Sequence, residues 1–148
     1  MRESFGGTFM IYVFIIFLAI YITFVAVAFN YARAFRVKNK VIDIIEQNEG
    51  MEKADFNNLS GTNSLGVAGQ VNEYLRKVSY NVNLPNSYDD KYGTCFDLGY
   101  CVDEIISDNI TGKYYKVTTF VRLEIPFLDL GFTIPVKGET RKIERINR

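Results

Sequence analysis

The sequence of 148 residues contains no histidine and no tryptophan, and it has only three prolines and two cysteines. Without histidine, the chain lacks the side chain that most often transfers protons near neutral pH and most often binds metal ions. A serine nucleophile would need a lysine or carboxylate base instead, and no recognisable spacing provides one. The composition therefore argues against hydrolases and metalloenzymes. We expect no catalytic residues, no metal site and no cofactor.

An excess of charge of one sign is also missing, because 17 Lys and Arg residues balance 17 Asp and Glu residues. No basic field is available to hold nucleic acid, so we expect no nucleic-acid partner. Paired carboxylates occur at Asp89-Asp90 and Asp103-Glu104. Adjacent residues point apart on a strand, and such pairs on loops are usually solvated surface. We assign these pairs no role in catalysis.

One long hydrophobic run stands near the N-terminal end of the chain. Residues 9–29 carry no charge, and a helix of about 20 residues is long enough to cross the hydrocarbon core of a bilayer. A cleaved secretory signal has a shorter apolar core that ends in small residues, whereas Asn30-Tyr-Ala-Arg-Ala-Phe follows here. We therefore predict a short tail over residues 1–8 and a transmembrane helix over residues 9–29, surrounded by the lipid bilayer.

The helix is predicted to continue beyond the membrane as an amphipathic extension over residues 30–50. No Pro or Gly interrupts residues 8–49, and Gly50 stands where a C-terminal cap is expected. Positions with near-helical spacing, and charges mostly between them, are Tyr31, Ala34, Phe35, Lys38, Val41, Ile42 and Ile45. Such a stripe needs a surface to pack on. That surface is either the chain's own domain or the helix of a partner.

Residues 51–148 are predicted to form one small extracytoplasmic α+β domain. Its first part reads as a polar loop over residues 55–63 and a short amphipathic helix that Ser64 can cap. The apolar side of this helix carries Val67, Val71, Tyr74, Leu75 and Val78. Residues 81–93 contain turn-forming residues without periodicity, so we predict a loop there.

In the last third of the chain the hydrophobic period changes from helical to alternating. Residues 113–125 alternate throughout and predict a half-buried strand. A turn over residues 126–131 leads to a second strand, in which Pro135 suits an edge strand or a break because it cannot donate a ladder hydrogen bond. One face of that strand carries Phe132, Ile134 and Val136. With a further strand over residues 102–107, the pattern predicts a small antiparallel β-meander of about three strands, covered on one face by the amphipathic extension.

The two cysteines, Cys95 and Cys101, are separated by five residues, with Gly93 and Gly99 nearby. An even and close pair in a membrane-tethered domain predicts a disulfide loop in an oxidising compartment. Two reduced cysteines facing the cytoplasm are the alternative. The spacing does not match the C-x-x-C pattern of a thioredoxin-like redox site.

A basic cluster follows the apolar run directly and consists of Arg33, Arg36, Lys38 and Lys40. These side chains could bind anionic lipid headgroups or only solvate the helix. The positive-inside rule places this flank in the cytoplasm. The cysteine pair and the short N-terminal tail favour the opposite orientation, with a cytoplasmic N-terminus and the domain outside. From the residues alone both orientations stay open.

Three stretches occur in an informative order. A glycine-containing N-terminus runs straight into an apolar helix over residues 6–12, the helix continues over residues 31–42, and a strand pair ends over residues 131–141. In this order they resemble the TadE-like minor pilins, or pseudopilins, of bacterial tight-adherence (Tad) pilus systems. The resemblance covers the first fifty residues and about the last thirty. It implies a pilin-like fold with a long N-terminal helix.

The resemblance also implies a structural role at the cell surface. In such families the apolar helix is held in the membrane with the domain outside, and then packs against other pilin-like or pilus-assembly subunits. A basic flank just outside the membrane is common there. Prepilins are cut after a glycine with a Glu five residues later, so Gly6 and Gly7 mark the candidate cleavage region. Ile11 and Tyr12 occupy the fifth places here, which leaves open whether the chain is cut or acts uncut.

Our leading hypothesis is therefore a minor pilin-like, membrane-anchored structural subunit of a pilus or secretion assembly, and not an enzyme. The alternative is a single-pass, membrane-anchored extracellular sensor or ligand-binding module. In that case Tyr88, Tyr92 and Tyr100 would line a site near the cysteine loop. The apolar helix has no GxxxG pair, so an ordinary lipid-facing anchor is compatible with its sequence as well.

Overall fold

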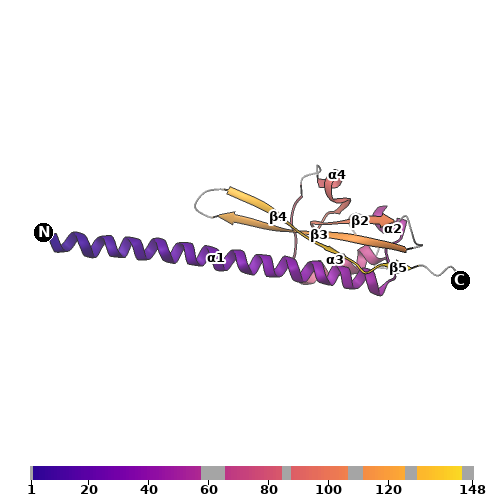
Figure 1. Ribbon diagram of the computed structural model, residues 1–148, viewed down its shortest axis with the longest axis horizontal. Helices are drawn as coiled ribbons and strands as arrows, with labels where there is room; N and C mark the ends of the chain where they lie inside the picture. Colours follow the sequence, from indigo (N-terminus) through magenta and orange to yellow (C-terminus); the bar gives the residue numbers. More distant parts are fainter. Residues whose placement is uncertain (1, 58–65, 85–87, 107–111, 126–129, 145–148) are drawn as a thin grey trace.

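A single helix, α1 (Arg2–Gln47), runs along the molecule, and the rest of the chain packs against its C-terminal half (Figure 1). The computed structural model describes residues 2–57, 66–84, 88–106, 112–125 and 130–144. Helix α1 is uninterrupted for 46 residues across the predicted span and its extension. It begins at Arg2 rather than at Phe9, so residues 2–8 of the predicted tail are part of the helix.

Helix α1 ends in a Schellman motif, which differs by one residue from the cap predicted at Gly50. The amide of Gly50 donates to the carbonyl of Ile45 at 2.9 Å, and the amide of Glu49 donates to the carbonyl of Glu46 at 3.2 Å. The left-handed cap residue is Glu49, with φ 56°. Gly50 is needed as glycine for two other reasons, since its φ is 113° and a Cβ atom there would lie 2.8 Å from the hydroxyl of Tyr115.

Among the described residues after α1 there are three short helices and five strands. They are α2 (Lys53–Asn57), α3 (Val67–Lys77), α4 (Asp89–Tyr92), β1 (Thr94–Phe96), β2 (Tyr100–Ile106), β3 (Gly112–Ile125), β4 (Leu130–Glu139) and β5 (Ile143–Glu144). Every strand pairing is antiparallel, in the order β1-β2-β3-β4, with β5 also beside β3. The α+β class and the antiparallel sheet are thus confirmed, while β1 and β5 add to the three strands expected. Pro135 lies on β4, which is an edge strand as its residue type predicts.

Two segments predicted as loops contain helical turns, namely α2 at the start of residues 55–63 and α4 at the end of residues 81–93. The predicted cap Ser64 lies outside the described residues, and α3 instead has Gly66 as its N-cap without a side-chain hydrogen bond. The carboxylate of Asp55, which lies outside α3, caps the helix instead. It accepts the amide of Glu52 at 3.0 Å before α2 and the amide of Ala68 at 3.2 Å in the first turn of α3.

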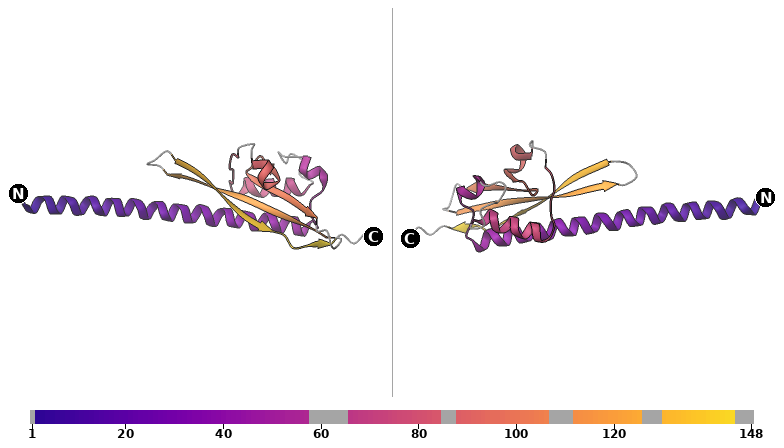
Figure 2. Two further views of the ribbon diagram at one scale, coloured as in Figure 1. Left: turned by 45° about the horizontal axis from the view of Figure 1, so that its top comes forward. Right: turned by 180° about the vertical axis from the view of Figure 1, so that it is seen from behind.

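Helices α1 and α3 lie side by side under one face of the sheet, and the α4 segment lies over the other face (Figures 1 and 2). Because both faces of the sheet are covered here, the prediction that β3 is buried on one face only is wrong for the middle of the strand. Val117 and Thr119 on the face toward α1 are buried, but Thr118 and Phe120 on the opposite face are buried as well. The sequence alternation could not predict this second cover, because α4 comes from a segment without periodicity.

Candidate membrane and assembly surface

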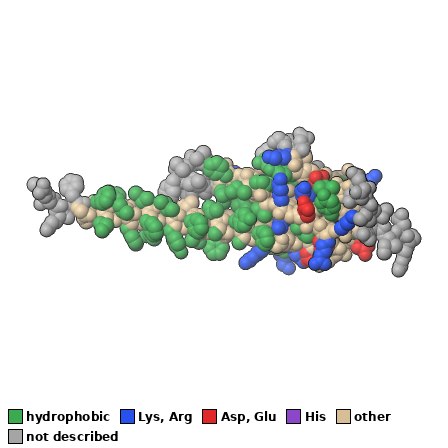
Figure 3. Space-filling view, viewed as in Figure 1, with side chains coloured by type: hydrophobic (Ala, Val, Ile, Leu, Met, Phe, Trp, Pro, Cys, Tyr) green, Lys and Arg blue, Asp and Glu red, His purple; other side chains and the backbone are tan. Residues whose placement is uncertain are grey.

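The N-terminal half of α1 makes no contact that buries it. We call residues 9–29 the apolar arm. Its large side chains are highly exposed, for example Phe9 at 68%, Phe17 at 66% and Phe24 at 70%. Figure 3 shows these hydrophobic side chains along the arm, whereas Lys, Arg, Asp and Glu gather over the domain. The arm belongs to a helix that is long and apolar enough to cross a membrane.

The polar groups of the arm are suited to an apolar environment. The helix pairs its backbone amides and carbonyls internally, which is the condition for a segment to enter lipid. The hydroxyl of Thr23 donates to the carbonyl of Ala19 at 2.8 Å, so this side chain too has a partner within the helix. The backbone and the Thr23 hydroxyl of the arm can therefore be covered either by lipid or by other apolar helices without losing a hydrogen bond.

The C-terminal half of α1 is covered by the chain's own domain, which decides between the two surfaces that the sequence allowed. Val37, Val41, Ile44 and Ile45 are buried against the sheet and α3. The buried stripe is rotated relative to the predicted one. Val37 and Ile44 were missed, whereas Tyr31 and Phe35 are 51% and 44% exposed.

Three of the four predicted juxtamembrane basic residues are held by contacts within the protein. The guanidinium of Arg33 donates to the carbonyls of Val78 and Ser79, which end α3. A cation at this position also compensates the negative end of the helix dipole. The other two are Lys38, which is 8% exposed with its ammonium 4.1 Å from the ring centroid of Phe35, and Lys40.

Lys40 pairs with Asp43 one turn further along α1, at 2.6 Å. The hydrogen bond from Lys40 holds the pKa of Asp43 below its usual value. Arg36 differs from the other members of the cluster, because it is exposed and makes no hydrogen bond or ion pair with the described part of the chain. Arg33 thus joins α1 to its domain, Lys38 and Lys40 interact with neighbours on α1 itself, and Arg36 is the member that is left for a partner or a lipid headgroup.

Cys95 and Cys101 face each other across the β1–β2 hairpin, as directly paired residues. Their sulfur atoms form a disulfide bond. The turn between the strands contains Gly99 at φ 89°, where a Cβ atom would lie 2.2 Å from the carbonyl oxygen of Val82. Cys101 is fully buried, whereas Cys95 is partly exposed.

The three tyrosines of the alternative hypothesis do not line a common open site. Tyr88 and Tyr92 stack at 5.4 Å and both contact the edge or face of Phe120. Tyr100 is fully buried and stacks on Phe96 at 4.5 Å. Burial raises the pKa of Tyr100, and the nearby Asp55 raises it further. These rings are core packing, so the placement of Tyr100 argues against the ligand site suggested for it.

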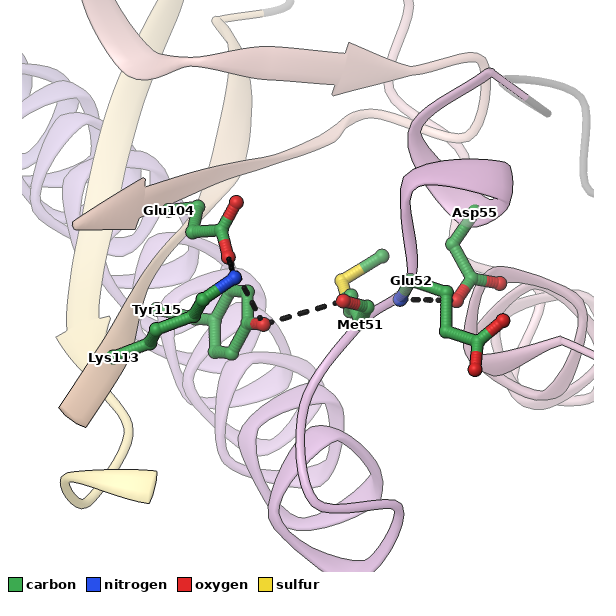
Figure 4. Close-up of polar contacts among 6 residues, drawn as sticks. All are labelled: Met51, Glu52, Asp55, Glu104, Lys113 and Tyr115. Carbon is green, nitrogen blue, oxygen red and sulfur yellow. Dashed lines mark hydrogen bonds and ion pairs between the residues drawn. The ribbon is translucent and has the colours of Figure 1, made fainter. Parts of the chain in front are cut away.

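One member of each carboxylate pair singled out in the sequence, Glu104 and Asp89, has a structural partner. Glu104 on β2 forms an ion pair with Lys113 on β3 at 2.6 Å (Figure 4). The hydroxyl of Tyr115 lies 3.5 Å from the same carboxylate and 3.3 Å from the carbonyl of Met51, just beyond the end of α1. Asp89 accepts the amide of Cys95 at 3.0 Å. Among the described residues no group of three His, Cys, Asp or Glu side chains is placed to hold a metal ion.

Gly6 and Gly7, the candidate cleavage region, lie within α1. A Cβ atom at either position would meet nothing within 4 Å. Since glycine in a helix costs about 0.5–1 kcal/mol relative to alanine, the fold of the single chain gives no reason for glycine at these two places.

Helix α1 thus has an exposed apolar arm toward its N-terminal end, while its C-terminal half is packed against the domain. Known proteins add nothing to this description. The chain matches no protein-family model, no curated protein and no solved structure. The resemblance to TadE-like pilins accordingly rests on the order of the three sequence stretches alone.

The residues that hold α1, α3 and β3 together were found only in part from the sequence. Arg33 was recognised as basic but not as the partner of α3. Tyr80, whose hydroxyl hydrogen-bonds the backbone of Phe120 on β3, was not singled out at all. Asp55 carried a usable signal, because the spacing Glu52-x-x-Asp55 is that of a helix start at which a side chain three positions further on accepts the amide of the first residue. The partners of Arg33 and Tyr80 lie far along the chain and leave no local pattern.

Proposed function

We propose that this chain is a membrane-anchored, minor pilin-like structural subunit of a bacterial pilus or secretion assembly, of the TadE-like kind. The observation that carries the proposal is the division of α1. One half of an uninterrupted helix is buried under its own domain, while the other half exposes almost all of its apolar side chains. This division suits a subunit that is anchored by the arm and presents the domain outside.

Energetics support a covered arm. Removing a large apolar side chain from water stabilises by about 1.5–3 kcal/mol, and Phe14, Ile16 and Phe17 are three of many that are 59–66% exposed. Exposure of the whole arm to water would cost more than the net stability of a small domain, about 5–15 kcal/mol. Lipid covers the arm in the membrane-held state. In an assembly, the apolar helices of neighbouring subunits take the place of lipid.

The arrangement favours a domain outside the cytoplasm. A bonded cysteine pair is typical of oxidising compartments. The basic flank is the opposing argument, but Arg33 and Lys40 are explained by contacts within the protein. We therefore propose a short cytoplasmic N-terminus, with residues 51–148 outside.

The assembly role is tested by isolating the native complex with mild detergent from cells that carry a tagged chain. We expect pilus or pilus-motor components to be recovered with it. A photo-reactive amino acid at Phe14 should cross-link to those components, whereas the same amino acid at Ile106, exposed at the far end of the sheet, should cross-link less. Recovery without any such component would count heavily against the proposal.

The orientation is tested by thiol labelling on intact cells. We expect no labelling of Cys95 or Cys101 until a reductant is added, and then labelling without permeabilisation. Labelling that needs permeabilisation but no reductant would place the domain in the cytoplasm and would exclude the pilin-like role.

A further inference from the structure

One face of the β3–β4 hairpin is apolar from its base outward. In the antiparallel register Val121 is opposite Ile134 and Leu123 is opposite Phe132, so these four side chains share a face. Val121 is buried with Ala34 of α1, which shows that this face points toward the helix. Farther from the body of the domain this face is no longer covered, and Ile134 and Phe132 are 41% and 51% exposed.

The hairpin leaves the body of the domain toward the N-terminal end of α1. In all three ribbon views it projects along the helix and diverges from it, so that its end lies beside the apolar arm and away from the other strands (Figures 1 and 2). The apolar face of the hairpin is therefore at the same level as the part of the arm that needs cover. Lipid or protein that surrounds the C-terminal turns of the arm therefore also contacts this face of the hairpin.

Basic side chains mark the base of the hairpin, where Arg33 and Arg36 on α1 and Lys137 on β4 are all exposed. Arg122 on β3 is exposed as well, but it lies opposite Thr133, and both Arg122 and Lys137 are on the other face of the hairpin from Phe132 and Ile134. Figure 3 shows the change from hydrophobic to charged side chains at the place where the hairpin joins the domain. An apolar zone bordered by cations matches a bilayer, in which the acyl region meets anionic headgroups.

We propose that the end of the β3–β4 hairpin is a second membrane contact, which buries Phe132 and Ile134 in the leaflet through which the arm leaves the bilayer. This inference rests on the membrane anchoring in the proposed function, though not on the assembly role. A single helix leaves the domain free to rotate about the arm. Two contacts fix the rotation of the domain relative to the membrane surface, and so fix which face it presents to a partner.

The expected depth is shallow. Strand β4 is the outer strand of the sheet, and an edge strand leaves backbone groups without partners. Such groups are costly in the hydrocarbon core but can bind water near the headgroups. Phe132 and Ile134 should therefore lie in the interfacial region, where amphipathic elements insert about 5–10 Å. A second copy of the chain is the competing occupant, and the experiment separates the two.

The absence of tryptophan makes the test direct, since one introduced tryptophan is the only indole in the chain. The full-length Phe132→Trp variant is reconstituted into vesicles of phosphatidylethanolamine and phosphatidylglycerol that contain phosphatidylcholine with a spin label at a shallow or a deep acyl position. We expect a blue-shifted emission that the shallow label quenches more strongly than the deep one. Ile134→Trp should behave in the same way and serves as the second variant if the first fails to fold.

Two further variants make the outcomes distinct. Ile106→Trp, 66% exposed at the other end of the sheet, should stay red-shifted and unquenched. Phe24→Trp in the arm should be quenched by the deep label if the arm spans the bilayer. Unquenched emission from both hairpin variants, with Phe24→Trp quenched, would overturn the hairpin contact and leave the anchor intact.

Blue-shifted but unquenched emission at Phe132 would indicate contact with protein and would overturn the proposal in favour of a second copy. If Phe24→Trp is also unquenched, the membrane anchoring itself is wrong and the hairpin contact falls with it. Far-UV circular dichroism of each reconstituted variant verifies that the helix and the sheet are retained.

Discussion

The hydroxyl of Tyr80 lies 2.9 Å from both the amide nitrogen and the carbonyl oxygen of Phe120. Strand β2 pairs with β3 only as far as Thr119, opposite Tyr100, so Phe120 has no strand partner on this side. The hydroxyl accepts the amide proton of Phe120, and it can donate to that residue's carbonyl or to the carbonyl of Gly99 at 3.0 Å. One side chain thus takes the place of a missing strand where the β3–β4 hairpin leaves the domain.

We expect Tyr80→Phe to lower the free energy of unfolding by about 1–3 kcal/mol, because buried backbone groups of Phe120 lose their partner while the packing is kept. Denaturant unfolding of the full chain in detergent micelles, followed by circular dichroism, measures the change. Tyr74→Phe removes a hydroxyl from a partly exposed tyrosine and should have little effect. Equal effects of the two variants would contradict the role assigned to the Tyr80 hydroxyl.

The domain is expected to lose stability in alkali. Burial raises the pKa of Tyr80 to about 12 and raises that of Tyr100 as well, whereas an unfolded tyrosine has a pKa of about 10. Below pH 10 the stabilisation is fully present, because both states keep the proton. Above pH 10 the unfolded chain releases it first, so the free energy of unfolding falls as pH rises toward 12.

Unfolding midpoints measured between pH 8 and pH 12 check this expectation. The free energy of unfolding should decline less steeply with pH in Tyr80→Phe than in the parent chain, because one tyrosine with a raised pKa is removed. The control Tyr74→Phe should follow the parent. A stability that does not change through this range would show that the buried tyrosines do not control it.

Replacing Asn72 by Leu is expected to stabilise the domain. Asn72 on α3 is 1% exposed, and neither its side-chain oxygen nor its nitrogen has a hydrogen-bond partner within the described ranges of the chain. An unpaired buried polar group costs about 1–3 kcal/mol, so a leucine of similar volume should raise the free energy of unfolding by about 1 kcal/mol or more. Asn81→Leu at an exposed position is the control, expected within about 0.5 kcal/mol. A clear loss of stability in Asn72→Leu would indicate that Asn72 is paired in solution.

Arg33 and Arg36 should differ although both are exposed and adjacent to the arm. Arg33→Met removes the donor to the carbonyls of Val78 and Ser79 and should lower the free energy of unfolding by about 1 kcal/mol, a value reduced by solvent exposure. Arg36→Met should be nearly neutral. Thermal unfolding of both variants measures the difference, and two equal values would mean that Arg33 does not hold α3.

The two cysteines should react differently once reduced. Cys95 is partly exposed and Cys101 fully buried, so after mild reduction a thiol reagent should label Cys95 first. Reduction should cost about 2 kcal/mol in stability, since the closed loop is short. Mass spectrometry of peptides after timed labelling measures the order. Equal labelling rates for both thiols would indicate that the hairpin opens on reduction.

Local pattern predicted several elements correctly. The alternation through residues 113–125 predicted β3, the proline at position 135 predicted an edge strand, and the uninterrupted run predicted a single long helix. The short helices α2 and α4 were missed, because one turn of helix has no periodicity to detect. The cap predicted at Gly50 was one residue off, because Glu49 adopts the left-handed conformation that usually selects glycine.

What the sequence by itself determined is the apolar arm and the three longer strands, since each follows from composition and spacing within one segment. It also predicted part of the buried stripe of α1, including Val41 and Ile45, but the burial of Val37 and Ile44 was decided by the tertiary structure, through contacts with elements later in the chain. Arg33 binds α3 across 45 positions and Tyr80 binds β3 across 40. Such pairs form only after the chain has folded, so no window of sequence contains both partners and no local pattern can assign their roles.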